Sequence, residues 1–236
     1  MKNRMRYFFL LLILVSVSLT SCNNDDDNDD PQPEPERAEV SFADQEELVT
    51  FSEGMRSSSN PYAIQTVIYG SLINGIYQSN KAYMNISEDA EFDQGCWSWG
   101  DGQGNAVRYC FTETATDYNF SAEIRFSGGA FQKVYEGTEK KDGSSGNIDY
   151  YDFETGSLVA NLSWQVAGAE VTWTWSVDND KLEIKYNEST QMGSLEYIEN
   201  GVLTYGSTWN NQTCSGTYND YEAGDAGTWN CSSTTN

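Results

Sequence analysis

Apolar and polar residues alternate along much of the chain after residue 92. Residues 171–177 read Val-Thr-Trp-Thr-Trp-Ser-Val, and residues 181–186 alternate charged and apolar side chains in the same way. A period of two is typical of a β-strand that buries one face and exposes the other. The pair Asn200-Gly201 lies between two such segments and favours a type I′ hairpin. The pattern predicts about twelve β-strands.

Short turns separate these segments, and this spacing decides how the strands pair. Antiparallel neighbours can be joined by a few residues, whereas parallel neighbours need a long crossover. We therefore expect a mainly β protein with an antiparallel meander. A sheet of about twelve strands usually curls or splits, so the fold is either a barrel or a sandwich, and the spacing does not separate the two.

One earlier segment, about 61–78, has the period of a helix. Asn60 suits the N-cap and Pro61 the first helical position. Apolar residues then recur at steps of three and four, at Ile64, Val67, Ile68, Leu72, Ile76 and Tyr77. We expect this helix to cover an end or a face of the sheet.

The first residues have the organisation of an export signal. Lys2, Arg4 and Arg6 precede an apolar run at 7–17, which is too short to span a bilayer. Leu19-Thr20-Ser21-Cys22 follows and resembles the lipobox of bacterial lipoproteins. That resemblance implies removal of residues 1–21 and acylation of Cys22 by diacylglycerol and a further fatty acid such as palmitate. Two or more acyl chains suffice for stable membrane anchoring.

The segment after Cys22 is acidic and rich in proline. Residues 23–36 carry many aspartates, spaced prolines and no aromatic residue, so we expect 22–37 to form a disordered tether. The segment lacks the glycine turn and the ligand spacing of a calcium loop. A lipidated cysteine followed by Asn and Asp also resembles the export signal of surface-exposed lipoproteins of Bacteroidota-type bacteria. The resemblance implies an outer-membrane, cell-surface protein. The remaining length predicts a single folded domain at 38–236.

Charge excludes two classes of partner. Without residues 1–21 the chain has 10 basic and 36 acidic residues, a net charge of −26. Nucleic-acid binding and polybasic attachment to anionic lipid both need clustered Lys and Arg. We therefore predict no nucleic-acid partner and a membrane contact through lipid alone.

Four cysteines remain after Cys22, in two short spans. A hairpin turn near Gln103 would place Cys96 opposite Cys110, and a turn at 222–223 would do the same for Cys214 and Cys231. Exported proteins meet oxidising conditions, so we predict two cross-strand disulfides, with free buried thiols as the competing interpretation. Neither pair has the short gap of a zinc knuckle.

Catalytic chemistry has little support in the residues. The chain contains no histidine, which excludes Ser-His-Asp and Cys-His machinery and His-ligated metals. It also lacks glycine-rich phosphate loops. We predict no cofactor, no metal and no enzyme. Paired carboxylates keep an acid–base glycosidase open as a competing hypothesis.

Aromatic residues supply the remaining hypothesis. Trp97, Trp99 and Tyr109 lie near a predicted hairpin turn, where exposed rings could stack on a sugar, although core packing is the stronger interpretation of tryptophan in strands. The leading hypothesis is a non-catalytic surface lipoprotein that binds a glycan or another extracellular ligand. Two further hypotheses are a lipocalin-like carrier of an apolar ligand and an accessory subunit of a surface complex.

Overall fold

The computed structural model describes residues 47–232, which form two helices and one antiparallel sheet of thirteen strands. The predicted signal peptide, Cys22 and the acidic tether lie outside the described residues. Each strand pairs with the next one along the chain. The strands are β1 (Glu91–Asp93), β2 (Cys96–Gly100), β3 (Ala106–Glu113), β4 (Asp117–Arg125), β5 (Gln132–Lys140), β6 (Ser145–Tyr151), β7 (Leu158–Ala167), β8 (Glu170–Val177), β9 (Asp180–Asn187), β10 (Met192–Glu199), β11 (Val202–Asn210), β12 (Ser215–Asp220) and β13 (Asp225–Asn230).

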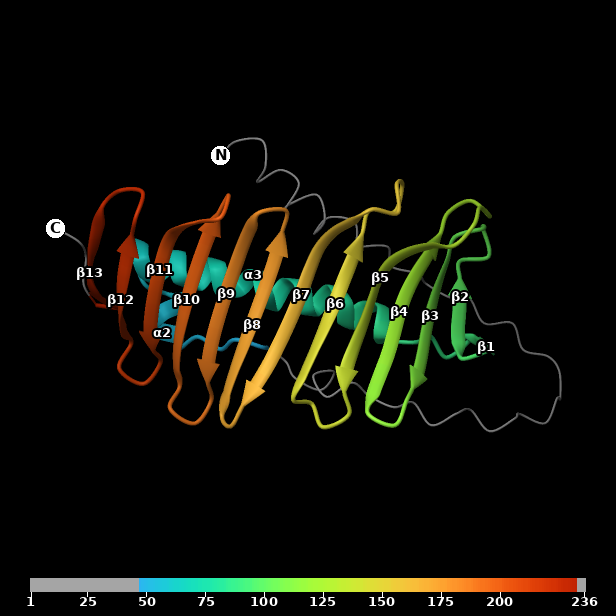
Figure 1. The fold of residues 1–236 in the computed structure, drawn as a ribbon, viewed down its shortest axis with the longest axis horizontal. Coiled ribbons are helices and arrows are strands. Elements are labelled where there is room, and N and C mark those ends of the chain that lie inside the picture. The colour runs from blue at the N-terminus through green and yellow to red at the C-terminus, as the bar shows by residue number, and fades with distance from the viewer. Residues whose placement is uncertain (1–46, 233–236) are drawn as a thin grey trace.

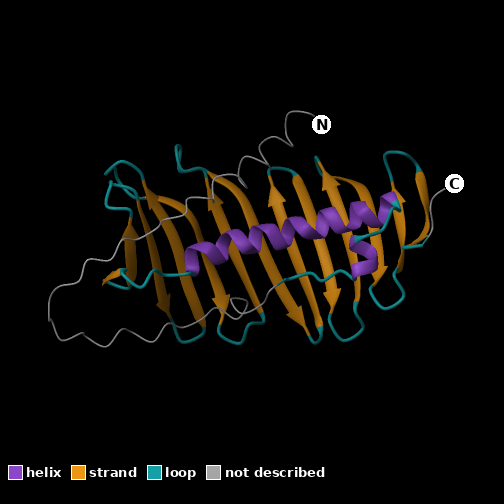
Figure 2. Ribbon diagram, turned by 180° about the vertical axis from the view of Figure 1, so that it is seen from behind, coloured by secondary structure: helices purple, strands orange, loops and turns teal. Residues whose placement is uncertain are grey.

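The predicted antiparallel meander is confirmed, with one strand more than expected. The sheet does not close into a barrel, and β1 and β13 lie at its opposite ends (Figure 1). Helix α3 (Pro61–Met84) crosses one face of the sheet and supplies the second layer (Figure 2). Thirteen strands at about 4.8 Å spacing make a sheet on the order of 60 Å wide, so one face offers a broad, nearly continuous surface.

The long helix begins where the sequence predicts and ends later. The Asn60 side chain accepts hydrogen bonds from the backbone N–H groups of Tyr62 and Ala63, with Pro61 in the first turn. The helix continues past 78 to Met84 because its last turns also reach the sheet, where the buried Asn80 amide donates to the Tyr150 hydroxyl. Its 24 residues span about 36 Å. No helix among the described residues is long and apolar enough to cross a membrane.

Aromatic rings fill the space between α3 and the sheet. The sheet face toward α3, here called the inner face, buries the following large side chains: Trp97, Tyr109, Phe120, Tyr135, Ile148, Tyr150, Leu162, Trp164, Trp173, Trp175, Leu182, Ile184, Tyr186, Leu195, Tyr205, Trp209 and Trp229. Several indole rings lie over a glycine of the neighbouring strand. A Cβ on Gly146 or Gly193 would come within 2.1 Å of Trp164 or Trp209. These glycines are therefore needed for close ring packing.

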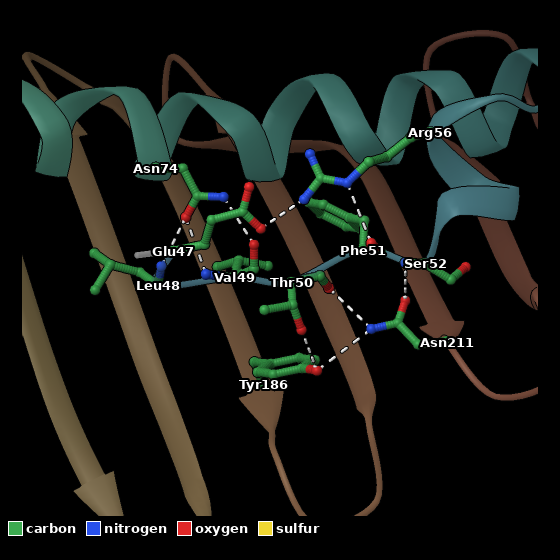
Figure 3. A network of polar contacts seen from close by, with 10 residues as sticks. All are labelled: Glu47, Leu48, Val49, Thr50, Phe51, Ser52, Arg56, Asn74, Tyr186 and Asn211. Atoms are coloured by element: carbon green, nitrogen blue, oxygen red, sulfur yellow. Dashed lines mark hydrogen bonds and ion pairs between the residues drawn. The ribbon is translucent and has the colours of Figure 1, made fainter. Parts of the chain in front are cut away.

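An extended segment, residues 47–52 and here called the strap, runs beside α3 over the inner face (Figure 3). Asn74 of α3 holds it through three hydrogen bonds (Figure 3). The Asn74 Oδ1 accepts from the N–H groups of Leu48 and Val49, both at 2.9 Å, and its Nδ2 donates to the Val49 carbonyl at 2.7 Å. The amide thus replaces the pairing that a neighbouring strand would provide.

A second asparagine holds the other end of the strap. Asn211, in the β11–β12 turn, accepts from the Ser52 N–H and donates to the Thr50 carbonyl, both at 2.9 Å (Figure 3). The Thr50 hydroxyl also hydrogen-bonds the Tyr186 hydroxyl at 2.5 Å. The strap therefore joins the helix layer to the sheet at two separate points.

Both predicted disulfides are present. Cys96 pairs with Cys110 across β2 and β3. Cys214 pairs with Cys231 at the ends of β12 and β13. Short helix α2 (Glu53–Arg56) packs directly on the second disulfide, since a Cβ on Gly54 would lie 2.6 Å from the Cys214 sulfur. This bridge fixes the last hairpin beneath the helix layer.

Candidate functional site

The sheet face opposite α3, here called the outer face, is covered by neither helix (Figures 1 and 2). Strand register aligns short polar side chains across its centre. This polar row consists of Thr112, Asn119, Thr138, Asn147, Ser163 and Thr174. Within it, Thr138 donates to the Asn147 side-chain oxygen at 2.7 Å. The row presents uncharged donors and acceptors in a line that runs across the strands.

A cluster of basic and aromatic side chains lies beside the row, toward the ends of β3, β4 and β5. We call Arg108, Glu123, Arg125, Phe131 and Lys133 the basic–aromatic cluster. The Arg108 and Arg125 guanidinium carbons lie 4.4 and 4.8 Å from the centroid of the Phe131 ring. Arg108 also forms an ion pair with Glu123, its register partner on β4. The Phe131 ring thus makes a cation–π contact with each of the two guanidinium groups, and each contact is electrostatically favourable.

Lys133 links this cluster to Tyr151 on β6. Its ammonium lies 2.5 Å from the Glu136 carboxylate and 5.4 Å from the centroid of the Tyr151 ring, and the Tyr151 hydroxyl donates to the same carboxylate. The bond to Lys133, followed by the bond to Tyr151, lowers the pKa of Glu136. In return, Glu136 raises the pKa of Tyr151 to about 12. At neutral pH the carboxylate is charged and the phenol is protonated.

Glu183, another carboxylate on this face, is also held in the charged form. Hydrogen bonds from Lys181 and then Lys185 lower the pKa of Glu183 on β9. Asp149 accepts a hydrogen bond from the Asn161 amide at 2.7 Å. Hydrogen bonds likewise lower the pKa of five further carboxyl groups: Asp101, Asp117, Asp142, Asp152 and Asp225.

A shallow depression of about 430 Å³ lies between β10 and β13, at the C-terminal end of the sheet. Three threonines in register, Thr208, Thr217 and Thr228, contribute to its lining. The Thr208 and Thr217 hydroxyls bond each other at 2.7 Å. Met192, Trp209 and Trp229 also line the depression, and none of its lining residues is charged.

The aromatic residues nominated from the sequence lie on the inner face. Trp97 and Tyr109 are 4% and 5% exposed, and Trp99 is partly buried against the same core. Trp97 packs on Phe92, with ring centroids 4.8 Å apart. Strand alternation explains this placement, because Cys96 and Cys110 take the outward positions of their hairpin. The rings of Trp97 and Tyr109 are therefore out of reach of a ligand on the outer face, and core packing accounts for them.

Sequence reasoning did not find the basic–aromatic cluster. Residues 108, 125 and 131 come together only through the register of β3 and β4 and through the loop at 126–131. The one usable signal was charge complementarity, because a hairpin turn near 115 would place Arg108 opposite Glu123. Within residues 47–232, no group of three or more Cys, Asp or Glu side chains is arranged to hold a metal ion.

The fold and the outer face define a class of protein: a single antiparallel sheet, backed by one long helix, that leaves one broad polar face uncovered. Beyond that class, the chain matches no protein-family model and no curated protein.

Proposed function

We propose that the protein is a non-catalytic binding module of the bacterial cell surface, anchored through lipid at Cys22, and that it holds an extracellular glycan on the outer face. The observation that carries the proposal is the uncovered polar row beside the basic–aromatic cluster. Sugars are recognised by hydroxyl and amide groups together with a small number of aromatic surfaces, and the outer face offers both.

The two faces of the sheet differ in what covers them, and this difference supports a role in binding. The inner face is occupied by α3, the strap and the aromatic core. The hydrophobic core therefore lies on one side of the sheet only. On the other side, exposed strand positions carry threonine, serine and asparagine, and few large apolar groups, so the face is suited to a hydrated ligand.

Glu136 and Glu183 on the outer face favour binding over acid–base catalysis. A glycosidase needs one carboxyl group whose pKa is raised, so that it can donate a proton to the leaving oxygen. Glu136 and Glu183 have pKa values shifted in the opposite direction by lysine neighbours. Such groups suit hydrogen-bond acceptance from sugar hydroxyls.

The proposal also rests on the export signal. The resemblance of residues 19–22 to a lipobox supports an anchored protein, and two disulfides suit a compartment outside the cytoplasm. A tether at 22–37 would let the sheet stand away from the membrane and meet soluble or cell-wall polysaccharides.

A glycan array probed with residues 23–236 tests the proposal. We expect retention on a subset of glycans, and loss of that retention when Ser163→Trp places an indole in the middle of the polar row. Ser71→Trp, at an exposed position of α3, is the matched control and should bind as the unmodified chain does. Absence of retention on every glycan, or equal loss in both variants, would rule out glycan binding by the outer face.

A further inference from the structure

Basic residues are scarce in this chain, and nearly all those described are neutralised. The following form ion pairs with acidic neighbours: Arg56, Arg108, Lys133, Lys140, Lys141, Lys181 and Lys185. Between residues 47 and 232 the exceptions are Lys81 and Arg125. Of these two, Arg125 lies on the outer face.

The Arg125 side chain is held in place while its buried Nε–H lacks a partner. The residue occupies the last position of β4, opposite Ala106 of β3, and its guanidinium stacks on Phe131. The Nε–H meets no acceptor among the described residues. A buried charged donor without an acceptor is costly. With acidic side chains so abundant, the missing partner distinguishes Arg125 from the paired cations.

Arg108 adds a second guanidinium to the same place. It lies against the same phenyl ring, and its side chain is 39% exposed although it is paired with Glu123. Two like charges around one ring repel each other, and an anion placed near both would relieve that repulsion. Guanidinium groups bind carboxylate, sulfate and phosphate oxygens through paired N–H donors.

We propose that Arg125, together with Arg108 and the Phe131 ring, binds the carboxylate or sulfate group of an acidic sugar residue. This inference rests on the proposed function and names the glycan class. The net charge of −26 repels a long, densely charged polymer at long range, so the fitting ligand is a short acidic oligosaccharide or a polymer with few acidic sugars. At 0.15 M salt the Debye length is about 8 Å, so direct contacts at the cluster outweigh that repulsion.

Calorimetric titration of residues 23–236 at 0.15 M salt tests the inference with matched oligosaccharides. Trigalacturonate and its methyl ester differ in the carboxylate charge, and a sulfated carrageenan tetrasaccharide and its desulfated counterpart differ in the sulfate. We expect at least one acidic member to bind ten-fold or more tightly than its neutral counterpart. The pair that shows the difference identifies the anionic group.

Variants locate the contact. Arg125→Gln should weaken acidic-ligand binding about 10- to 100-fold and leave neutral-ligand binding unchanged, because it removes the charged donors that only an anionic group needs. Lys141→Gln removes one positive charge just beyond the end of β5 that lies away from Phe131, where Lys141 pairs with Glu113, and it should have no effect. If Arg125→Gln proves unstable, Arg125→Lys keeps the charge but loses the paired donors, and it should still weaken binding.

The two proposals fail in different ways. Equal binding of acidic and neutral sugars, unaltered by Arg125→Gln and Arg125→Lys, would refute the anion site and leave glycan binding standing. Absence of binding to any of the four oligosaccharides, together with an empty glycan array, would refute both.

Discussion

Gly193 of β10 provides a sharp test of how the aromatic core is built. It pairs in register with Trp209 of β11, and a Cβ at this position would lie 2.1 Å from Cζ2 of the indole ring. Gly206, also in β11, points to the outer face, where the nearest atom to an added Cβ is 3.8 Å away. Gly193→Ala and Gly206→Ala therefore add the same methyl group on opposite faces of one hairpin.

The ring has little room to move away from an added methyl group. Trp209 is 1% exposed and packs against Phe51 and Tyr186, with ring centroids at 5.3 and 6.3 Å. Overpacking of this kind typically costs about 1–3 kcal/mol. For a domain of this size, 1 kcal/mol lowers Tm by roughly 2–4 °C, so Gly193→Ala should lower Tm by about 2–12 °C. Gly206→Ala should be neutral or stabilise by up to about 1 kcal/mol.

Thermal unfolding followed by circular dichroism measures both changes. Trp209→Leu removes the obstructing ring, so adding Gly193→Ala to that variant should cost little, and the double-mutant cycle should give a coupling of about 1–3 kcal/mol. Equal stability of Gly193→Ala and Gly206→Ala, or a coupling near zero, would show that the indole does not occupy the space above the glycine.

Three further predictions concern anchoring, the strap and pH. Cys22→Ser should leave the chain unacylated and release it from washed envelopes on fractionation; unchanged processing and retention would contradict lipid anchoring. Asn74→Ala should lower the free energy of unfolding by about 1–3 kcal/mol in urea titrations, because strap backbone groups lose their partners, whereas Ser71→Ala on the exposed side of α3 should not. Burial raises the pKa of Tyr109 and Tyr150, whereas tyrosine in the unfolded chain ionises near pH 10. The contribution of these residues to the free energy of unfolding should therefore be complete below pH 10 and decrease above it. An unchanged urea midpoint between pH 8 and pH 11 would contradict that burial.

Local patterns predicted the elements because local chemistry determines them. The Asn60-Pro61 start of α3 depends on capping groups within three residues. Asn200 and Gly201 both have positive φ, as a type I′ turn requires. The disulfides followed from hairpin symmetry about glycine-rich turns.

Sheet closure and the strap were beyond the sequence because they depend on contacts between distant segments. The meander pattern suits an open sheet as well as a closed one, and the choice depends on α3 lying across the inner face. The strap depends on Asn74 and Asn211, two amides that resemble any other polar residue until the fold brings them to the chain at 48–52.

The candidate site was missed because aromatic residues were chosen for their place near a predicted hairpin turn. Tryptophan is prominent in the sequence, yet Trp97, Trp173 and Trp209 all pack on the inner face. The outer face instead presents Phe131, with a cation on each of two neighbouring strands. Period-two alternation in the sequence separates the residues of the two sheet faces. Only the position of α3 in the structure shows which of these faces the helix leaves open.

The central claim is that the outer face binds an acidic glycan at Arg125. The most direct test is NMR of ¹⁵N-labelled residues 23–236, titrated with trigalacturonate and with the sulfated tetrasaccharide. The buried Arg125 Nε–H gives its own side-chain resonance. We predict that this resonance and the backbone amides of Phe131 and Ser163 shift on addition of at least one of the two ligands, while those of α3 and the strap stay in place. Unmoved outer-face signals at saturating concentrations of both, or shifts confined to α3 and the strap, would contradict the claim.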